Sequence, residues 1–125
     1  AVNKFCWQAT MGQPLTVWKT AMDQKRPYLD LSDSVRAICH ILNNNLFDNR
    51  VYNVITLNAT VRDIISEIKV HIPKLNVQLV ENKIMNQMSY EVGDDHFKAS
   101  GFRPKGNLEK GISDTMRLLA AVHRK

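Results

Sequence analysis

The chain has 125 residues, of which 44% are hydrophobic and 23% are charged, and its formal net charge is +5. This length predicts a single domain with a modest core, and this apolar share excludes wholesale disorder. The mild positive charge favours anionic partners such as phosphates or nucleotides, whereas the scattered distribution of the basic residues disfavours a nucleic acid.

The amino-terminal part of the sequence predicts a helix followed by a strand. Residues 2–11 carry apolar side chains at helical spacing, and the Gly-Gln-Pro run at 12–14 ends that helix. Residues 15–18 are β-branched and aromatic, which is typical of a strand. A polar loop is expected over residues 19–25.

A short extended segment is then predicted to lead into a second helix. Residues 27–31 are expected to be extended, because proline disfavours a helical conformation in the residue before it. Ser32 or Asp33 is predicted to cap a helix that runs to about Asn43. The apolar residues of this helix recur on one side, and they are Val35, Ile38, Cys39 and Leu42.

The middle of the chain contains the clearest strand pattern in the sequence, at residues 51–55. Thr60 is then predicted to cap a helix that closes at Pro73, with Asp63 at the capping-box position. Residues 76–80 predict a further strand.

The carboxy-terminal part predicts two helices, while residues 81–92 fit no single element. A short helix is expected over residues 94–99, with Gly101 in its cap, and Asn107 is predicted to cap the last helix. Because strands and helices alternate, the sequence predicts one α/β domain over residues 1–125, small and mixed, without linkers or repeats.

Cellular context is predicted from what the sequence does not contain. No run is long and apolar enough to cross a membrane and no secretory signal is recognisable, so a cytoplasmic location is expected. Cys6 and Cys39 lie in apolar helical patterns, which predicts buried free thiols. The chain begins at Ala1, without methionine and within a helical pattern, which suggests a piece of a longer protein.

The motifs of common active sites are missing from the sequence. It has no glycine-rich dinucleotide loop, no phosphate-binding loop, no Cys-x-x-Cys pair and no His-Glu-x-x-His motif. The four histidines are scattered, and the cluster of Met85, Met88 and Tyr90 is interpreted as core or interface packing. The residues therefore predict no catalytic and no metal site.

Three residues are suited to holding a ligand. Arg26 could clamp a phosphate through its planar fork of donors, Trp18 offers a flat face to a base or sugar, and Asn53 offers an amide. Each also has a structural interpretation. Arg26 could pair with Asp30 or Asp33, Trp18 could pack in the core, and Asn53 could form a turn hydrogen bond.

Three sequence blocks in order resemble the extended short-chain dehydrogenase/reductases, the family of NAD-dependent nucleotide-sugar epimerases and dehydratases. The first joins GQPLTVW with QKRPYLDLSDSV, the second joins VYNV with TVRDII, and the third runs from KASGFRP to Thr115. Each block alone is weak, but together they span nearly the whole chain. The first forty residues are similar in particular to the UDP-sulfoquinovose synthase branch of that family.

The resemblance implies a fold and a cofactor. It covers only the carboxy-terminal substrate domain of such enzymes, so the Rossmann domain that binds NAD would lie outside this chain. The family's glycine loop and its Tyr-x-x-x-Lys catalytic pair are also missing. No cofactor and no catalytic residue are therefore expected in the chain itself, and NAD is implied for the full-length enzyme only.

The resemblance also assigns ligand residues and two possible functions. It implies that Arg26 contacts the diphosphate and that Thr16 and Trp18 border the base. Lys83 stands near the position where many members carry a second arginine. The expected function is nucleotide-sugar binding within such an enzyme, beside its missing Rossmann domain. The alternative is a stand-alone, non-catalytic binding or oligomerisation module, whose exposed strand edges and helix faces would favour a homo-oligomer.

Overall fold

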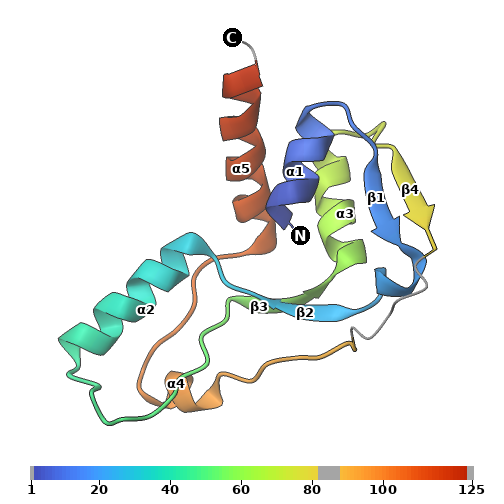
Figure 1. The fold of residues 1–125 in the computed structure, drawn as a ribbon. Helices are drawn as coiled ribbons and strands as arrows, with labels where there is room; N and C mark the ends of the chain where they lie inside the picture. The colour runs from blue at the N-terminus through green and yellow to red at the C-terminus, as the bar shows by residue number, and fades with distance from the viewer. Residues whose placement is uncertain (1, 82–87, 124–125) are drawn as a thin grey trace.

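A computed structural model describes residues 2–81 and 88–123 of the chain (Figure 1). The first half contains α1 (Val2–Thr10), β1 (Leu15–Trp18), the 3-10 turn η1 (Lys19–Ala21), β2 (Lys25–Tyr28) and α2 (Leu31–Asn43). The second half contains β3 (Leu57–Thr60), α3 (Val61–His71), β4 (Val77–Val80), α4 (Asp95–Ala99) and α5 (Leu108–His123). Within the described residues, helices and short strands alternate, as the sequence predicts for a small mixed α/β domain.

The strands form two separate two-stranded sheets. Strands β1 and β4 pair in parallel, with Leu15 opposite Val77, and β2 and β3 pair antiparallel, with Arg26 opposite Ala59. Parallel pairing requires a long connection, and the chain between β1 and β4 supplies it with β2, α2, β3 and α3.

The main core lies where three helices meet the first sheet. Helices α1, α3 and α5 pack against one another beside β1 (Figure 1). Their inward positions recur at helical spacing, because residues three and four apart share one side of a helix. The most deeply buried apolar side chains of this core are Cys6, Leu15, Ile64, Ile68 and Ile112.

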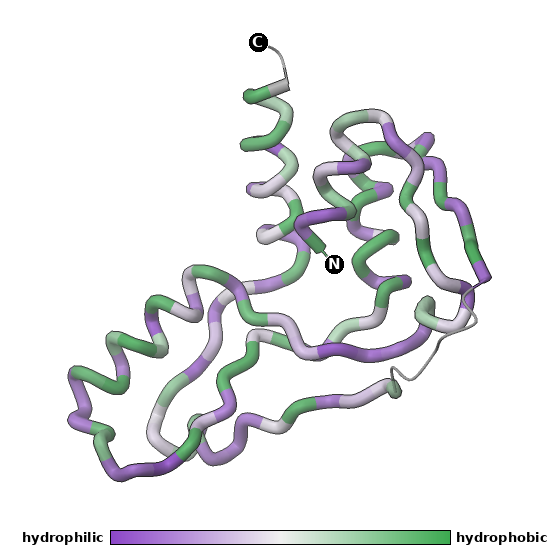
Figure 2. The backbone as a smooth tube through the Cα atoms, in the orientation of Figure 1, coloured by the Kyte–Doolittle hydropathy of each residue, from purple (hydrophilic) through white to green (hydrophobic). Residues whose placement is uncertain are grey.

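Helix α2, residues 44–56, α4 and residues 100–102 form a second, smaller unit, the α2 arm, which projects from the main core (Figure 1). Ala37, Phe97 and Phe102 form its buried cluster. Figure 2 shows hydrophobic positions recurring along α2, but the side chains of Leu31, Val35, Ile38 and Leu42 are 55–80% exposed. These four residues form the exposed α2 face. The periodic pattern predicted the helix correctly, but this side of it is largely exposed.

The prediction of a strand at residues 51–55 is wrong. A strand is stable only when its backbone groups pair with a neighbour, and no described segment pairs with these residues. The strand that does form is β3, shortly after them, where β2 supplies a partner along Leu57–Thr60. Val51 is 89% exposed, although its residue type favours burial.

Two further boundaries differ from the sequence-based prediction. Strand β2 begins at Lys25 rather than Pro27 and ends before Leu29. Helix α2 begins earlier than expected, because Asp30 rather than Ser32 or Asp33 is the cap, accepting a hydrogen bond from Ser32 N at 2.8 Å. The Asp33 carboxylate does not cap the helix. It is buried and accepts hydrogen bonds from other segments of the fold.

Other local predictions are confirmed. Thr60 and Asp63 form a reciprocal capping box at the start of α3, and Gly101 has a φ of +96° after α4, a conformation that favours glycine. Cys6 is buried as expected, whereas Cys39 is exposed on α2, contrary to the expectation. None of the described helices has the length and apolar character needed to span a membrane.

Candidate functional site

Arg26 lies in the middle of β2 and forms no ion pair with the described residues. Its guanidinium donates to the carbonyl oxygen of Lys25 at 2.7 Å and to Oε1 of Gln24 at 3.0 Å. The structural alternative, an ion pair with an aspartate, is wrong, because Asp30 bonds to Ser32 and Asp33 pairs with Arg36.

Residues 89–93 lie along the edge of β2 that faces away from β3. Lys25 N donates to Oγ of Ser89 at 2.9 Å, and Tyr90 N donates to the carbonyl of Lys25 at 3.3 Å. The ammonium group of Lys25 also pairs with Glu91 at 2.6 Å. Strand β2 therefore lies between two neighbours, although residues 89–93 are not a regular strand.

Pro27 explains why this edge is only partly bonded. Alternate residues of a strand direct their backbone groups to the same edge, so Pro27 shares with Lys25 the edge that faces residues 89–93. Proline has no N–H to donate at that edge. Because Pro27 does not face β3, the pairing of β2 with β3 loses no hydrogen bond through it. The amide of Asn58, opposite Pro27 in the β2–β3 register, bonds instead to both backbone groups of Val92 at 3.0 Å.

The ring of Tyr90 lies beneath the guanidinium of Arg26, the candidate ligand-binding residue. The guanidinium carbon of Arg26 is 4.9 Å from the centroid of the Tyr90 ring, within the range of a cation–π contact. Met88 and Tyr90 are 80% and 52% exposed, so neither belongs to the core. Sequence reasoning missed Tyr90 as a partner of Arg26, because the two residues are far apart in the chain.

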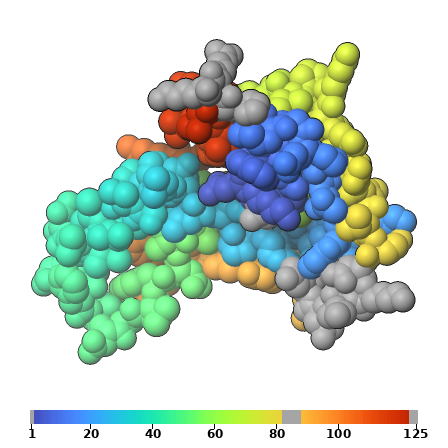
Figure 3. Space-filling model, turned by 45° about the horizontal axis from the view of Figure 1, so that its top comes forward, coloured from blue at the N-terminus to red at the C-terminus, as the bar shows by residue number. Residues whose placement is uncertain are grey.

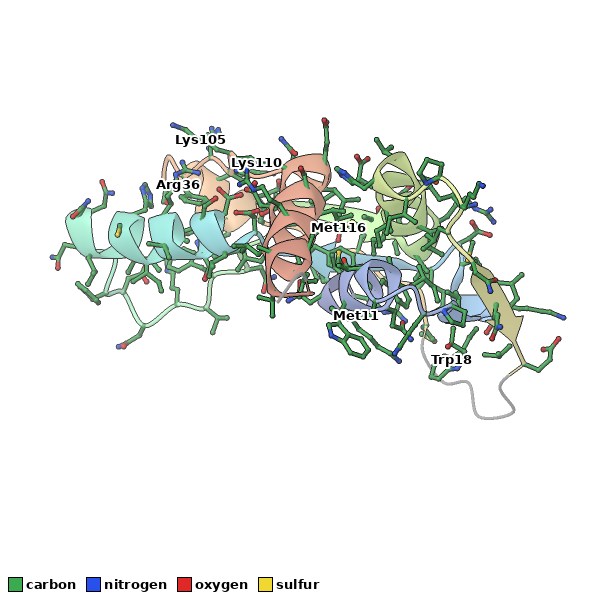
Figure 4. All side chains as sticks on the ribbon, turned by 90° about the horizontal axis from the view of Figure 1, so that it is seen from above. Met11, Trp18, Arg36, Lys105, Lys110 and Met116 are labelled. Atoms are coloured by element: carbon green, nitrogen blue, oxygen red, sulfur yellow. The ribbon has the colours of Figure 1, made fainter. Side chains whose placement is uncertain are left out.

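Thr16 and Trp18 lie on the exposed side of β1. The strand alternates, with Leu15 and Val17 buried in the core and Thr16 and Trp18 directed to the other side. Trp18 is 37% exposed, so the interpretation as a fully packed core residue is wrong. Figure 4 shows Trp18 at the end of the molecule remote from Arg36 and Lys105.

Asn53 is not among the described contacts of Arg26. Asn53 donates from Nδ2 to the carbonyl of Gly93 at 3.3 Å and borders a shallow hollow of about 310 Å³ with Tyr28 and Val92. It thus holds the segment that also carries Tyr90, through a bond between residues 40 positions apart rather than the turn hydrogen bond of the structural interpretation. Lys83 lies outside the described residues.

A larger hollow of about 970 Å³ opens beside the exposed α2 face. Figure 3 shows it between the beginnings of α1 (dark blue) and α2 (cyan) and the helix α5 (red). Leu31, Val35 and Leu118 give it apolar walls, and Lys105 and Lys110 border it. The sequence motifs did not predict it, because it forms only where three distant helix segments converge.

Asp33 organises one wall of this larger hollow. Its buried carboxylate accepts hydrogen bonds from the backbone N–H groups of Lys105 and Gly106 at 2.8 and 2.9 Å, and from Thr56 and Arg36 at 2.8 and 2.7 Å. Burial raises the pKa of Asp33, but these hydrogen bonds outweigh burial and hold its pKa below the ordinary value. The carboxylate therefore joins three separate segments of the fold as a charged group.

The described residues do not fit a dinucleotide cofactor or a metal ion. A dinucleotide needs a glycine turn from strand to helix, so that backbone can approach its pyrophosphate. Here β2 reaches α2 through Leu29 and Asp30, and β3 runs directly into α3. No three His, Cys, Asp or Glu side chains gather in a metal-binding group within the described part of the chain.

The chain is similar to three known proteins in particular. The chloroplastic UDP-sulfoquinovose synthase of Spinacia oleracea is 41% identical over 66 residues, 51% of this chain and 14% of that protein. The UDP-glucose 4-epimerase of Thermus thermophilus, solved in complex with NAD, matches with a TM-score of 0.74 at 25% identity, over 94% of this chain and 39% of that one. The GalE-like L-threonine dehydrogenase of Cupriavidus necator matches with a TM-score of 0.73 at 18% identity, over 93% and 40%.

These likenesses confirm the resemblance to extended short-chain dehydrogenase/reductases and the small mixed α/β fold. No protein-family profile matches the sequence. The chain spans about two fifths of the length of the two enzymes of known structure and a smaller share of the plant enzyme. Because a threonine dehydrogenase shares the fold at low identity, the fold alone does not identify a substrate.

Proposed function

We propose that the chain is the nucleotide-sugar-binding part of an NAD-dependent sugar epimerase or dehydratase, and that it does not catalyse a reaction by itself. The observation that carries this proposal is the state of Arg26. The guanidinium forms no ion pair among the described residues, yet the ring of Tyr90 and two acceptors hold it in place. A held cation without a counter-ion suits an anionic ligand.

Each candidate residue has a role in this proposal. Arg26 would donate to a diphosphate, while Thr16 and Trp18, on the exposed side of β1, would border the base. Asn53 would support the site through its bond to Gly93 rather than touch the ligand. Such contacts, remote from the reacting sugar carbon, let an enzyme use binding energy to orient that carbon.

A Rossmann domain outside this chain would hold NAD, which supplies hydride transfer when bound. Two features of the chain support contact with such a domain. Residues 51–55 have strand-forming side chains without a partner strand, and the exposed α2 face is uncovered along the described residues. A parallel sheet covered by helices could meet both needs. Its edge strand could pair with residues 51–55, and the helices that cover it could offer an apolar surface to the exposed α2 face.

The exposed α2 face also favours a second candidate function. Four large apolar side chains along one helix could equally be covered by a second copy of the chain. In that case the chain is a binding or oligomerisation module that acts without a catalytic domain. The two functions differ in ligand binding and in oligomeric state.

Calorimetric titration of the 125-residue chain with UDP-glucose, UDP-glucuronate and GDP-mannose tests the proposal, with size-exclusion chromatography on the same sample. We expect saturable binding of at least one ligand, weakened roughly tenfold to hundredfold by Arg26→Ala, as the loss of a charge-assisted hydrogen bond implies. Arg117→Ala, which removes an exposed arginine on α5, is the matched control and should leave binding unchanged.

Two outcomes would count against the proposal. Binding that Arg26→Ala does not weaken would remove Arg26 from the site. A folded, self-associated chain that binds none of the three ligands would favour the oligomerisation module.

A further inference from the structure

Tyr90 and Arg26 are connected in two ways. The ring of Tyr90 lies 4.9 Å from the guanidinium carbon, and both residues donate to the same acceptor, the carbonyl oxygen of Lys25. One bond comes from the backbone N–H of Tyr90 at 3.3 Å and the other from Nη1 of Arg26 at 2.7 Å. The position of the ring and the position of the guanidinium are therefore fixed against one point of β2.

The guanidinium keeps donors available in this arrangement. Arginine has five N–H groups in one plane, and two of them are used, by Lys25 O and by Gln24 Oε1. The other three have no hydrogen-bonding partner among the described residues. The contact with Tyr90 is between the guanidinium carbon and the aromatic ring, so it uses none of these N–H groups in a hydrogen bond.

The segment that carries Tyr90 is well fastened for a stretch without regular secondary structure. Ser89, Glu91 and Val92 each bond to β2 or β3, and Gly93 accepts a bond from Asn53. These bonds hold the backbone on both sides of Tyr90. The ring is consequently placed by its neighbours and can in turn limit the motion of a long, otherwise flexible arginine side chain.

We propose that Tyr90 is a positioning residue of the ligand site, which holds the guanidinium of Arg26 so that its three free N–H groups meet the phosphate groups of the ligand. This inference rests on the proposed function. The aromatic face is what matters, and the described contacts give the phenol hydroxyl no part in it. Tyr90 acts through Arg26 and not by touching the base of the nucleotide.

The test compares Tyr90→Leu, which removes the ring, with Tyr90→Phe, which keeps it. We expect Tyr90→Leu to weaken binding of UDP-glucose about two- to fivefold, as the loss of an exposed cation–π contact implies, and Tyr90→Phe to bind like the parent chain. Inorganic pyrophosphate should lose affinity by the same factor, because it has no base to stack on a ring. Trp7→Leu, an exposed aromatic on α1, is the matched control.

A double-mutant cycle separates positioning from direct contact. In an Arg26→Ala background, Tyr90→Leu should cause no further loss of affinity. A further loss there, or a loss with UDP-glucose but not with pyrophosphate, would mean that the ring contacts the base and would overturn the proposal.

A measurement without ligand judges the positioning by itself. The order parameter of the Arg26 Nε–H group, from nitrogen-15 relaxation, should fall in Tyr90→Leu and stay unchanged in Tyr90→Phe. An unchanged value in Tyr90→Leu would overturn the inference. If the parent chain binds no ligand while this order parameter still depends on the ring, the proposed function fails and the support of Arg26 by Tyr90 stands.

Discussion

The buried carboxylate of Asp33 accepts a hydrogen bond from the backbone N–H of Lys105, which lies 72 residues further along the chain. The same carboxylate bonds to Gly106, Thr56 and Arg36. One side chain near the start of α2 thus connects the α2 arm with the segment that leads into α5.

Replacing Asp33 by asparagine should lower the free energy of unfolding by about 1–3 kcal/mol at pH 7, because buried donors lose their acceptor. The folded-state pKa of Asp33 is lowered from 3.8, so its charged form stabilises the fold above that pH. This contribution is lost as the pH falls from 3.8 through the folded-state pKa. Urea denaturation at several pH values should show a smaller loss of stability on acidification in Asp33→Asn than in the parent chain. An equal loss in both would contradict this role.

Thr60→Ala should destabilise the chain by about 1 kcal/mol, the usual effect of removing a helix cap. The hydroxyl of Thr60 accepts from Asp63 N at 3.1 Å, while the carboxylate of Asp63 accepts from Thr60 N at 2.8 Å. Helix α3 carries Ile64 and Ile68 of the main core. Fraying of its first turn would therefore weaken the packing of these side chains. Thermal denaturation would show the loss, and Thr20→Ala, in the exposed 3-10 turn, should show none.

The two thiols should differ in reactivity in the native protein. Cys6 is buried, and burial raises the pKa of its thiol to about 11, whereas Cys39 is exposed on α2. The thiolate is the reactive form, so a chromogenic disulfide reagent should label one thiol quickly and the second only after unfolding. Cys39→Ser should remove the fast phase and Cys6→Ser should keep it. Fast labelling of both thiols would mean that the main core opens readily.

Ile38→Glu should reduce association through the exposed α2 face with little change in stability. Ile38 is 58% exposed, so a charge there costs little in the isolated chain but would be buried unpaired in an interface. Sedimentation at several concentrations measures the effect. Ile65→Glu, in the main core, is the contrasting variant and should unfold the chain. Concentration-dependent association that Ile38→Glu leaves intact would place the contact elsewhere.

Sequence reasoning predicted the elements whose information is local. The capping box at Thr60 and the αL glycine at Gly101 depend on residues a few positions apart, and both appear where the sequence placed them. Residues 51–55 show the opposite case, since their pattern favours a strand but a strand also needs a partner. For the same reason the periodicity of α2 predicted a helix without telling whether its apolar side would be covered.

The candidate site was predictable only in part. Arg26 was selected because a guanidinium suits a phosphate, and the exposure of Thr16 and Trp18 follows from the alternation of β1. The contact between Arg26 and Tyr90 was not predictable, because it depends on residues 89–93 lying along β2. No spacing in the sequence reveals that arrangement, which arises from side-chain bonds such as those of Asn58 and Val92.

The division of buried apolar side chains into two clusters has a consequence for how the chain opens. Among the described residues, the α2 arm holds three buried apolar side chains and the main core holds ten. Local opening requires less free energy where fewer apolar contacts are broken. The amide protons of α2 can therefore exchange with solvent through an opening that leaves α1, α3 and α5 intact. We therefore expect two cooperative units, of which the weaker is the α2 arm with its exposed α2 face.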